Sequence, residues 1–168
     1  PDLSREATTY YSPESGVGKA FEAVPDGNRR IGVVGLGVGT LATYARQGDS
    51  VRFYEINPLV VQLAREKFRY LAECHGSVEL VLGDARLALE REAPQGFDVL
   101  AIDAFTGDAV PVHLLTREAF ALYTRHLKPG GVLAVHVSSK YLDLAPAVVR
   151  VGESLGWNSE VVENSRDD

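Results

Sequence analysis

Ile31-Gly-Val-Val-Gly-Leu-Gly-Val-Gly-Thr40 joins a short apolar run to a turn that contains three glycines. An apolar run of this length predicts a strand that is buried on both faces. The glycines let the backbone turn tightly and approach a ligand closely. Strand-like and helix-like segments alternate through the rest of the chain, which is typical of a parallel sheet covered by helices on both sides. The sequence therefore predicts an α/β fold, a three-layer Rossmann-like sheet whose strands are mostly parallel.

The expected elements follow from apolar runs, capping residues and turn signals. We expect strands at residues 31–35, 51–55, 78–82, 97–102, 131–137 and 157–162. Helices are expected at residues 19–24, 40–47, 58–68, 85–91, 114–127 and 144–155. With 168 residues, the chain predicts a single domain, in which residues 1–28 lead into a nucleoside-binding part at 29–168.

Composition excludes several classes of function. There are 17 basic and 23 acidic side chains, so the net charge of −6 argues against a nucleic-acid partner. The longest stretch without a charged residue, 31–45, has 15 residues and four glycines, which is too short to span a membrane. Cys74 is the only cysteine, which excludes an intrachain disulfide and favours a cytoplasmic protein. Because the chain begins at Pro1 and has no methionine, we interpret it as a fragment of a longer protein.

Acidic side chains mark the ends of three further predicted strands. Glu55 ends the second strand, Asp84 follows the third after Gly83, and Asp103 follows the fourth. Ligands of open α/β sheets bind beyond the carboxyl ends of the strands, where the strand order reverses. The sequence therefore predicts that these three carboxylates and the glycine turn form one ligand site.

The spacing of these residues indicates a ligand that contains a nucleoside. Glu55 lies 20 residues after Gly35, where a carboxylate can accept both ribose hydroxyls. Thr40 stands where the dinucleotide fingerprint needs Gly or Ala, which disfavours NAD and favours an S-adenosylmethionine-type ligand. Asp84 would accept the adenine amino group. Two structural alternatives remain open: the glycines form only a tight turn, and Asp84 only caps the following helix.

The loop Asp103-Ala-Phe-Thr-Gly-Asp108 bears on the reaction. A carboxylate there can stabilise a positively charged sulfonium, accept a proton from an attacking amine, or orient that amine. Asp108 could form the other side of a cation site. The alternative is that both acids are turn residues. His113 and His136 are interpreted as an exposed loop residue and a packed strand-end residue.

Together these motifs resemble the spermidine synthase family, the polyamine aminopropyltransferases, from about residue 8 to residue 162. The resemblance rests on the glycine turn, Tyr54-Glu-Ile-Asn57, Leu82-Gly-Asp-Ala85, Phe97-Asp-Val99, the Asp103 loop, Leu127-Lys-Pro-Gly-Gly131 and Thr9-Tyr-Tyr11. It implies a fold of the class I S-adenosylmethionine-dependent methyltransferase type, truncated at both ends. It also implies aminopropyl transfer from decarboxylated S-adenosylmethionine to a small-molecule amine, without a metal, in a cytoplasmic enzyme that could form a homodimer.

The resemblance also assigns residues to roles. Asp103 would be the proton acceptor, with Asp108 beside it as a second catalytic acid. Tyr10 or Tyr11 would line the amine site. The implied cofactor-binding residues are Gly35, Gly37, Gly39, Glu55, Ile56, Asp84 and Ala85.

Two departures from the family pattern weaken the expected amine site. Val38 stands where the family has an acid that holds the aminopropyl chain, and Asp108 follows Asp103 by five places instead of three. The nucleoside site is unaffected by either change. A methyltransferase that binds S-adenosylmethionine itself, and a catalytically inactive nucleoside-binding domain of a larger protein, therefore remain as alternatives.

Overall fold

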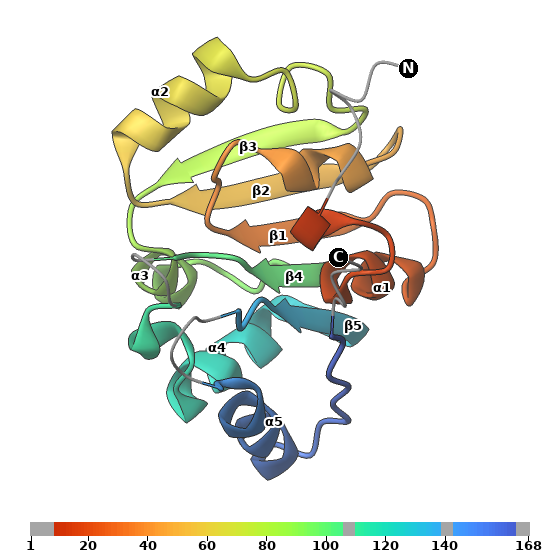
Figure 1. Ribbon diagram of the computed structural model, residues 1–168, viewed down its shortest axis with the longest axis vertical. Coiled ribbons are helices and arrows are strands. Elements are labelled where there is room, and N and C mark those ends of the chain that lie inside the picture. Colours follow the sequence, from red (N-terminus) through yellow and green to blue (C-terminus); the bar gives the residue numbers. More distant parts are fainter. Residues whose placement is uncertain (1–8, 106–109, 139–142, 164–168) are drawn as a thin grey trace.

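The computed structural model describes residues 9–105, 110–138 and 143–163. Its sheet has five strands in the order β3-β2-β1-β4-β5, which run from top to bottom in Figure 1. The strands are β1 Arg30–Val34, β2 Ser50–Glu55, β3 Ser77–Leu82, β4 Phe97–Ile102 and β5 Leu127–Val135, and every neighbouring pair is parallel. The chain builds outward from β1 to β3 and then crosses to β4, so the strand order reverses between β1 and β4. The predicted α/β fold with a parallel sheet is confirmed.

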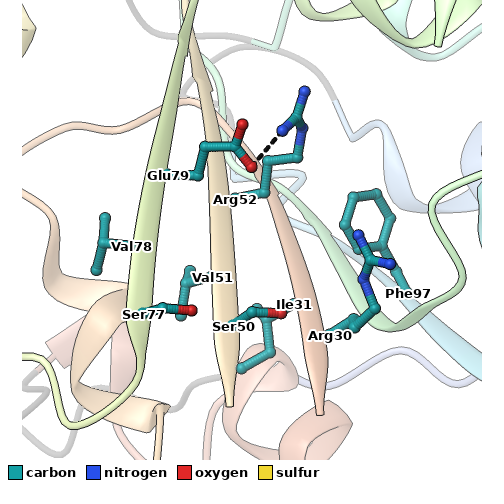
Figure 2. Close-up of a pocket in the computed structure, with 9 residues that line it drawn as sticks. All are labelled: Arg30, Ile31, Ser50, Val51, Arg52, Ser77, Val78, Glu79 and Phe97. Carbon is teal, nitrogen blue, oxygen red and sulfur yellow. Dashed lines mark ion pairs between the residues drawn. The ribbon is translucent and has the colours of Figure 1, made fainter. Parts of the chain in front are cut away.

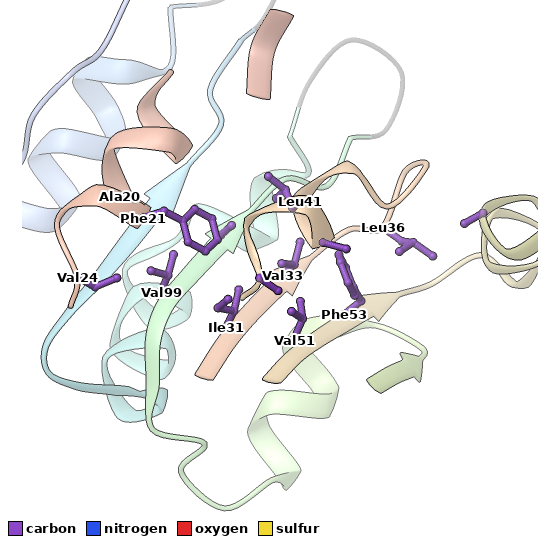
Figure 3. Packing of buried hydrophobic residues seen from close by; sticks show 14 residues of the cluster. Ala20, Phe21, Val24, Ile31, Val33, Leu36, Leu41, Val51, Phe53 and Val99 are labelled. Carbon is purple, nitrogen blue, oxygen red and sulfur yellow. The ribbon is translucent and has the colours of Figure 1, made fainter. Parts of the chain in front are cut away.

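Helices cover both faces of the sheet because the side chains of buried strands point alternately to the two sides. On one face, Ile31 and Val33 of β1 pack with residues of α1 Gly16–Glu22, the 3₁₀ helix η3 Thr40–Tyr44 and α2 Pro58–Lys67. Figure 3 shows this core, in which Phe53 is completely buried. On the other face, Val34 packs with residues of α3 Ala85–Arg91, α4 Arg117–His126 and α5 Ala145–Ser154. The remaining elements are two short 3₁₀ helices, η2 Thr9–Tyr11 and η4 Val112–Leu114.

Side-chain caps fix where several helices begin. Asn57 accepts a hydrogen bond from the N–H of Leu59 and precedes the proline that opens α2, as the sequence predicts. Thr116 accepts a hydrogen bond from the N–H of Ala119, so α4 begins at Arg117 and not at the expected residue 114.

Besides the start of α4, four predicted elements differ from the structure by more than one residue. The helix expected at 19–24 is α1, which begins at Gly16 because Ser15 accepts a hydrogen bond from the N–H of Gly18. The helix expected at 40–47 is the shorter η3, in which Thr43 donates its hydroxyl hydrogen to the Thr40 carbonyl, a bond that competes with regular helix.

The fifth strand was expected to begin at residue 131, but it begins at Leu127, which already pairs with Phe97 of β4. The next pair is Val99 with Val132, so the pairing register shifts where Pro129, Gly130 and Gly131 lie.

The predicted sixth strand at 157–162 is absent. Trp157 donates its N–H to the Gly152 carbonyl, and its ring packs against Phe120 of α4 with centroids 5.9 Å apart, so the start of the segment is held at the end of α5 and against α4. The residues after it are mostly exposed, which leaves no apolar face to hold them in the sheet. In the described part of the chain, no helix has the length and apolar character needed to cross a membrane.

A buried ion pair connects the start of β1 to the turn before β2. Arg29 donates to the Asp49 carboxylate through Nη2 at 2.7 Å and Nε at 2.9 Å, and both side chains are almost fully buried. Backbone N–H groups of Arg29 and Arg46 donate to the same carboxylate. Burial alone would raise the pKa of Asp49, but these hydrogen bonds and the Arg29 charge hold that pKa below its usual range.

Candidate active site at the carboxyl ends of the strands

Asp103 lies at the strand switch point and contacts both neighbouring strand ends. Its N–H donates to the Val34 carbonyl of β1, while the N–H of His136 donates to the Ile102 carbonyl of β4. These bonds continue the sheet pairing by one residue. They place Asp103 between the glycine turn that follows β1 and His136, which follows β5.

The glycine turn packs directly on the backbone of Asp103. Gly35, Gly37 and Gly39 all have positive φ values, of 97°, 53° and 89°. A side-chain carbon on Gly35 would lie 2.4 Å from the carbonyl oxygen of Asp103, so only glycine fits there. At Gly37 the same carbon would meet nothing within 4 Å. The turn is therefore closed toward Asp103 at Gly35 and open at its tip.

Glu55 holds the other side of the glycine turn. Its Oε2 accepts a hydrogen bond from the N–H of Leu36 at 3.0 Å, and its Oε1 accepts one from the N–H of Asn57 at 2.8 Å. The side chain is only 9% exposed. Because each carboxylate oxygen has two lone pairs, Glu55 keeps the capacity to accept further hydroxyl groups. Glu55 and Asp103 thus flank the same turn, as the sequence predicts, and the following Ile56 is 67% exposed.

Asp84 has the structural role that the sequence left open. Its Oδ1 accepts a hydrogen bond from the N–H of Leu87 at 2.9 Å, which makes Asp84 the N-cap of α3, and Ala85 is buried at the start of that helix. Its Oδ2 lies 3.4 Å from Nε2 of His113. His113 is half exposed, as expected, but it is not isolated from the site residues.

The carboxylate of Asp103 has a partner on each oxygen. Tyr11 Oη donates to Oδ2 at 2.9 Å, and His136 Nδ1 lies 2.8 Å from Oδ1. Tyr44 in turn donates its hydroxyl hydrogen to the Tyr11 carbonyl at 2.6 Å, which fixes η2 against the sheet. Burial, followed by the charge of Asp103, raises the pKa of Tyr11, so this phenol stays protonated and remains a donor.

Aromatic rings surround His136. The ring of Phe105 meets it edge-on with centroids 4.8 Å apart, and the rings of Tyr10 and Tyr11 lie 5.7 and 6.3 Å away. Its Nε2 is 2.9 Å from the hydroxyl oxygen of Ser138. Of the two tyrosines named from the family resemblance, Tyr11 therefore contacts Asp103 itself, and Tyr10 lies against the ring of His136.

The structure adds His136 to the site, which the sequence reading treated as a packing residue. The signal for it was available, since His136 is the first polar residue after an apolar strand, as Asp103 is after β4. Asp108, the other predicted catalytic acid, falls outside the described residues.

Two hollows lie away from these residues. One is at the opposite end of the sheet, where Arg30, Ser50 and Ser77 begin their strands (Figure 2). An ion pair between Arg52 and Glu79 crosses it. The other lies between α2 and the edge strand β3. Neither hollow includes any of the predicted site residues.

Comparison with known proteins connects this geometry to a family. No family model matches the chain. A polyamine aminopropyltransferase from Vibrio vulnificus is 31% identical over 155 residues, which cover 88% of this chain and 50% of the relative. This chain is a relative of the polyamine aminopropyltransferases. It spans half the length of that relative.

Solved structures agree with this relationship. A probable spermidine synthase from Corynebacterium glutamicum superposes with a TM-score of 0.62 at 29% identity, over 71% of this chain and 44% of the other. Human methyltransferase-like protein 13, solved in complex with SAH, gives a TM-score of 0.61 at 21% identity over 81% and 69% of the two chains. The second likeness concerns the fold alone and confirms the class I methyltransferase type.

Proposed function

We propose that this polyamine aminopropyltransferase relative carries the nucleoside-binding and reaction site of a transferase. It would bind decarboxylated S-adenosylmethionine and transfer the aminopropyl group to a small-molecule amine. The observation that carries the proposal is the pair of carboxylates, Glu55 and Asp103, on the two sides of one glycine turn. The family relationship supports the transfer chemistry.

Each side chain has a defined task under this proposal. Glu55 would hold the ribose hydroxyls, because its carboxylate is nearly buried, fixed by two backbone N–H groups and still able to accept hydrogen bonds. Backbone groups at the open tip of the glycine turn, Gly37 above all, would approach the ligand, and Gly39 completes the turn. Ile56 would cover one adenine face, and Asp84 with Ala85 would face its edge.

The reacting end would lie against Asp103. A sulfonium supplies an electrophilic carbon there, and the negative charge of Asp103 stabilises that cation. The rings of Tyr10, Tyr11 and Phe105 suit an amine or sulfonium, because cations are attracted to aromatic faces. The amine nitrogen forms a bond to the carbon, the carbon–sulfur bond breaks with its electron pair going to sulfur, and the nitrogen loses one proton.

One observation favours a second candidate, methyl transfer from S-adenosylmethionine itself. Val38, which replaces the acid of the family pattern, is 36% exposed in the glycine turn. A valine there brings no negative charge against the carboxylate that S-adenosylmethionine carries and its decarboxylated form lacks. The charge of the residue at position 38 therefore bears on which of the two ligands binds.

A cytoplasmic location and a homodimer stay predictions.

Calorimetric titration tests the proposal. We expect decarboxylated S-adenosylmethionine and methylthioadenosine to bind, and Glu55→Gln to weaken both by about 10- to 100-fold, the effect of losing a hydrogen bond to a charged group. Glu153→Gln, a substitution at the exposed end of α5, is the matched control.

Turnover with putrescine, followed as release of methylthioadenosine, tests the chemistry. Tighter binding of S-adenosylmethionine than of its decarboxylated form would favour methyl transfer. Failure of every adenosyl compound to bind would overturn the proposed function.

A further inference from the structure

The hydrogen bonds at the site form a line that runs from Tyr11 through Asp103 and His136 to Ser138. The distances along it are 2.9 Å from Tyr11 Oη to Asp103, 2.8 Å from Asp103 to His136 Nδ1, and 2.9 Å from His136 Nε2 to Ser138 Oγ. Three separate parts of the chain contribute, namely η2, the end of β4 and the end of β5. The sheet pairing fixes the middle of this line, because Asp103 and His136 follow directly on adjacent strands.

Both oxygens of Asp103 already have a partner inside the protein, which suits Asp103 to hold its neighbours in position. Tyr11 already donates to one of its oxygens and His136 contacts the other. The Tyr11 phenol stays protonated, so it continues to donate to Asp103.

His136, in contrast, is arranged to act as a base. An ionised carboxylate can only accept hydrogen bonds, so the nitrogen that faces Asp103, Nδ1, must carry a hydrogen. In the neutral ring the other nitrogen, Nε2, then has a free lone pair, and it points to the hydroxyl of Ser138, an exposed residue. This is the tautomer in which a histidine accepts protons at Nε2 while a carboxylate holds it in position.

We propose that His136 is the proton acceptor of the transfer reaction, with Asp103 and Tyr11 as positioning residues. The inference rests on the proposed function. As the new carbon–nitrogen bond forms and the carbon–sulfur bond breaks, the amine proton passes to Nε2, directly or through the Ser138 hydroxyl, which gives one proton and receives another. Asp103 stabilises the resulting imidazolium, which returns its proton to water after the product leaves.

The titratable groups that the described residues place against His136 are Asp103 from β4 and Tyr10 and Tyr11 from η2. Phe105 adds an apolar edge. Burial and the Asp103 charge keep Tyr11 protonated, so Asp103 supplies the charge that stabilises the protonated ring. The acid limb of the pH–rate profile should therefore report protonation of His136.

The first test needs no turnover. Nitrogen-15 NMR of the whole chain at pH 8 is expected to show His136 with its hydrogen on Nδ1, and Asp103→Asn should shift it toward the other tautomer. His75, which is exposed, is the internal reference and should not respond. A wild-type His136 with its hydrogen on Nε2 would overturn the inference.

The second test separates the two candidate bases. With putrescine and decarboxylated S-adenosylmethionine, His136→Gln should lower kcat by about 10²- to 10⁴-fold, the usual contribution of a general base. The same substitution should abolish the acid limb of the pH–rate profile and leave the affinity for methylthioadenosine within about threefold of the wild-type value. Asp103→Asn should slow the reaction but keep that limb, imidazole should partly rescue His136→Ala, and His75→Gln should behave as wild type.

The opposite pattern, in which the limb disappears in Asp103→Asn and persists in His136→Gln, would make Asp103 the base. Covalent labelling of Ser138 by a fluorophosphonate would also overturn the inference, because it would make the serine a nucleophile. A third result separates the inference from the proposed function. If the wild-type chain neither binds an adenosyl compound nor turns over putrescine, while His136 shows the expected tautomer, the proposed function is wrong but the inferred geometry of His136 is right.

Discussion

Replacing Gly35 by alanine should damage the protein far more than the same change at Gly37. Both residues have positive φ in one glycine turn, but only the side-chain carbon at Gly35 would collide, at 2.4 Å, with the backbone oxygen of Asp103. At Gly37 the cost is left-handed strain alone, about 1 kcal/mol. At Gly35, strain at φ 97° accounts for about 2 kcal/mol. Displacement of a rigid backbone group adds about 2 more.

The expected destabilisation is therefore about 4 kcal/mol for Gly35→Ala and about 1 kcal/mol for Gly37→Ala. A loss of 1 kcal/mol lowers Tm by about 2–4 °C in a chain of this size, so the two variants should melt roughly 10 °C apart. Urea unfolding followed by fluorescence of Trp157, the only tryptophan, measures both free energies. Equal losses in the two variants would refute the packing of the glycine turn on Asp103.

Three further substitutions test other parts of the structure. Asp49→Asn should cost about 3–5 kcal/mol in urea unfolding, because the buried Arg29 charge loses its buried partner and keeps the exposed Asp26, 3.5 Å away. Since the pKa of Asp49 is lowered in the folded state, its contribution is full above the unfolded pKa and is lost as pH falls through the folded one. The acid-side loss of stability should therefore be shallower in Asp49→Asn, and an unchanged slope would contradict this. Asp84→Ala should lose about 1 kcal/mol of stability as an N-cap while Asp84→Asn keeps it, and equal losses would show that Asp84 does not cap α3. Tyr123→Phe should cost about 1–3 kcal/mol, because the buried Leu114 carbonyl loses its donor at 3.0 Å, and a neutral result by thermal melting would exclude that bond.

The features that are local in sequence were predictable. An apolar run followed by glycines specified β1 and its turn, and the acid at each strand end marked the same edge of the sheet. Asn57 followed by Pro58 specified the start of α2 to the residue. These signals depend only on neighbouring residues, so a single sequence contains them.

The features that depend on which strands become neighbours were not predictable. His136 is the first polar residue after an apolar run, but nothing in its own segment shows that β5 lies beside β4, which brings His136 to Asp103. Residues 157–162 had the composition of a strand, but Trp157 is held by α4 and α5 instead. In both cases the outcome is set by contacts between segments that are distant in the sequence.

The bond from Tyr11 to Asp103 has a practical consequence for anyone who shortens this chain. A version that starts at Arg29 would retain β1 to β5 and both flanking carboxylates, yet it would lose the Tyr11 phenol, which donates to Asp103 from 92 positions away. It would also lose Phe21 and Val24, which help to fill one core. Expression designs should therefore treat the stretch ahead of β1 as an integral part of the folded unit and avoid trimming it as a tail.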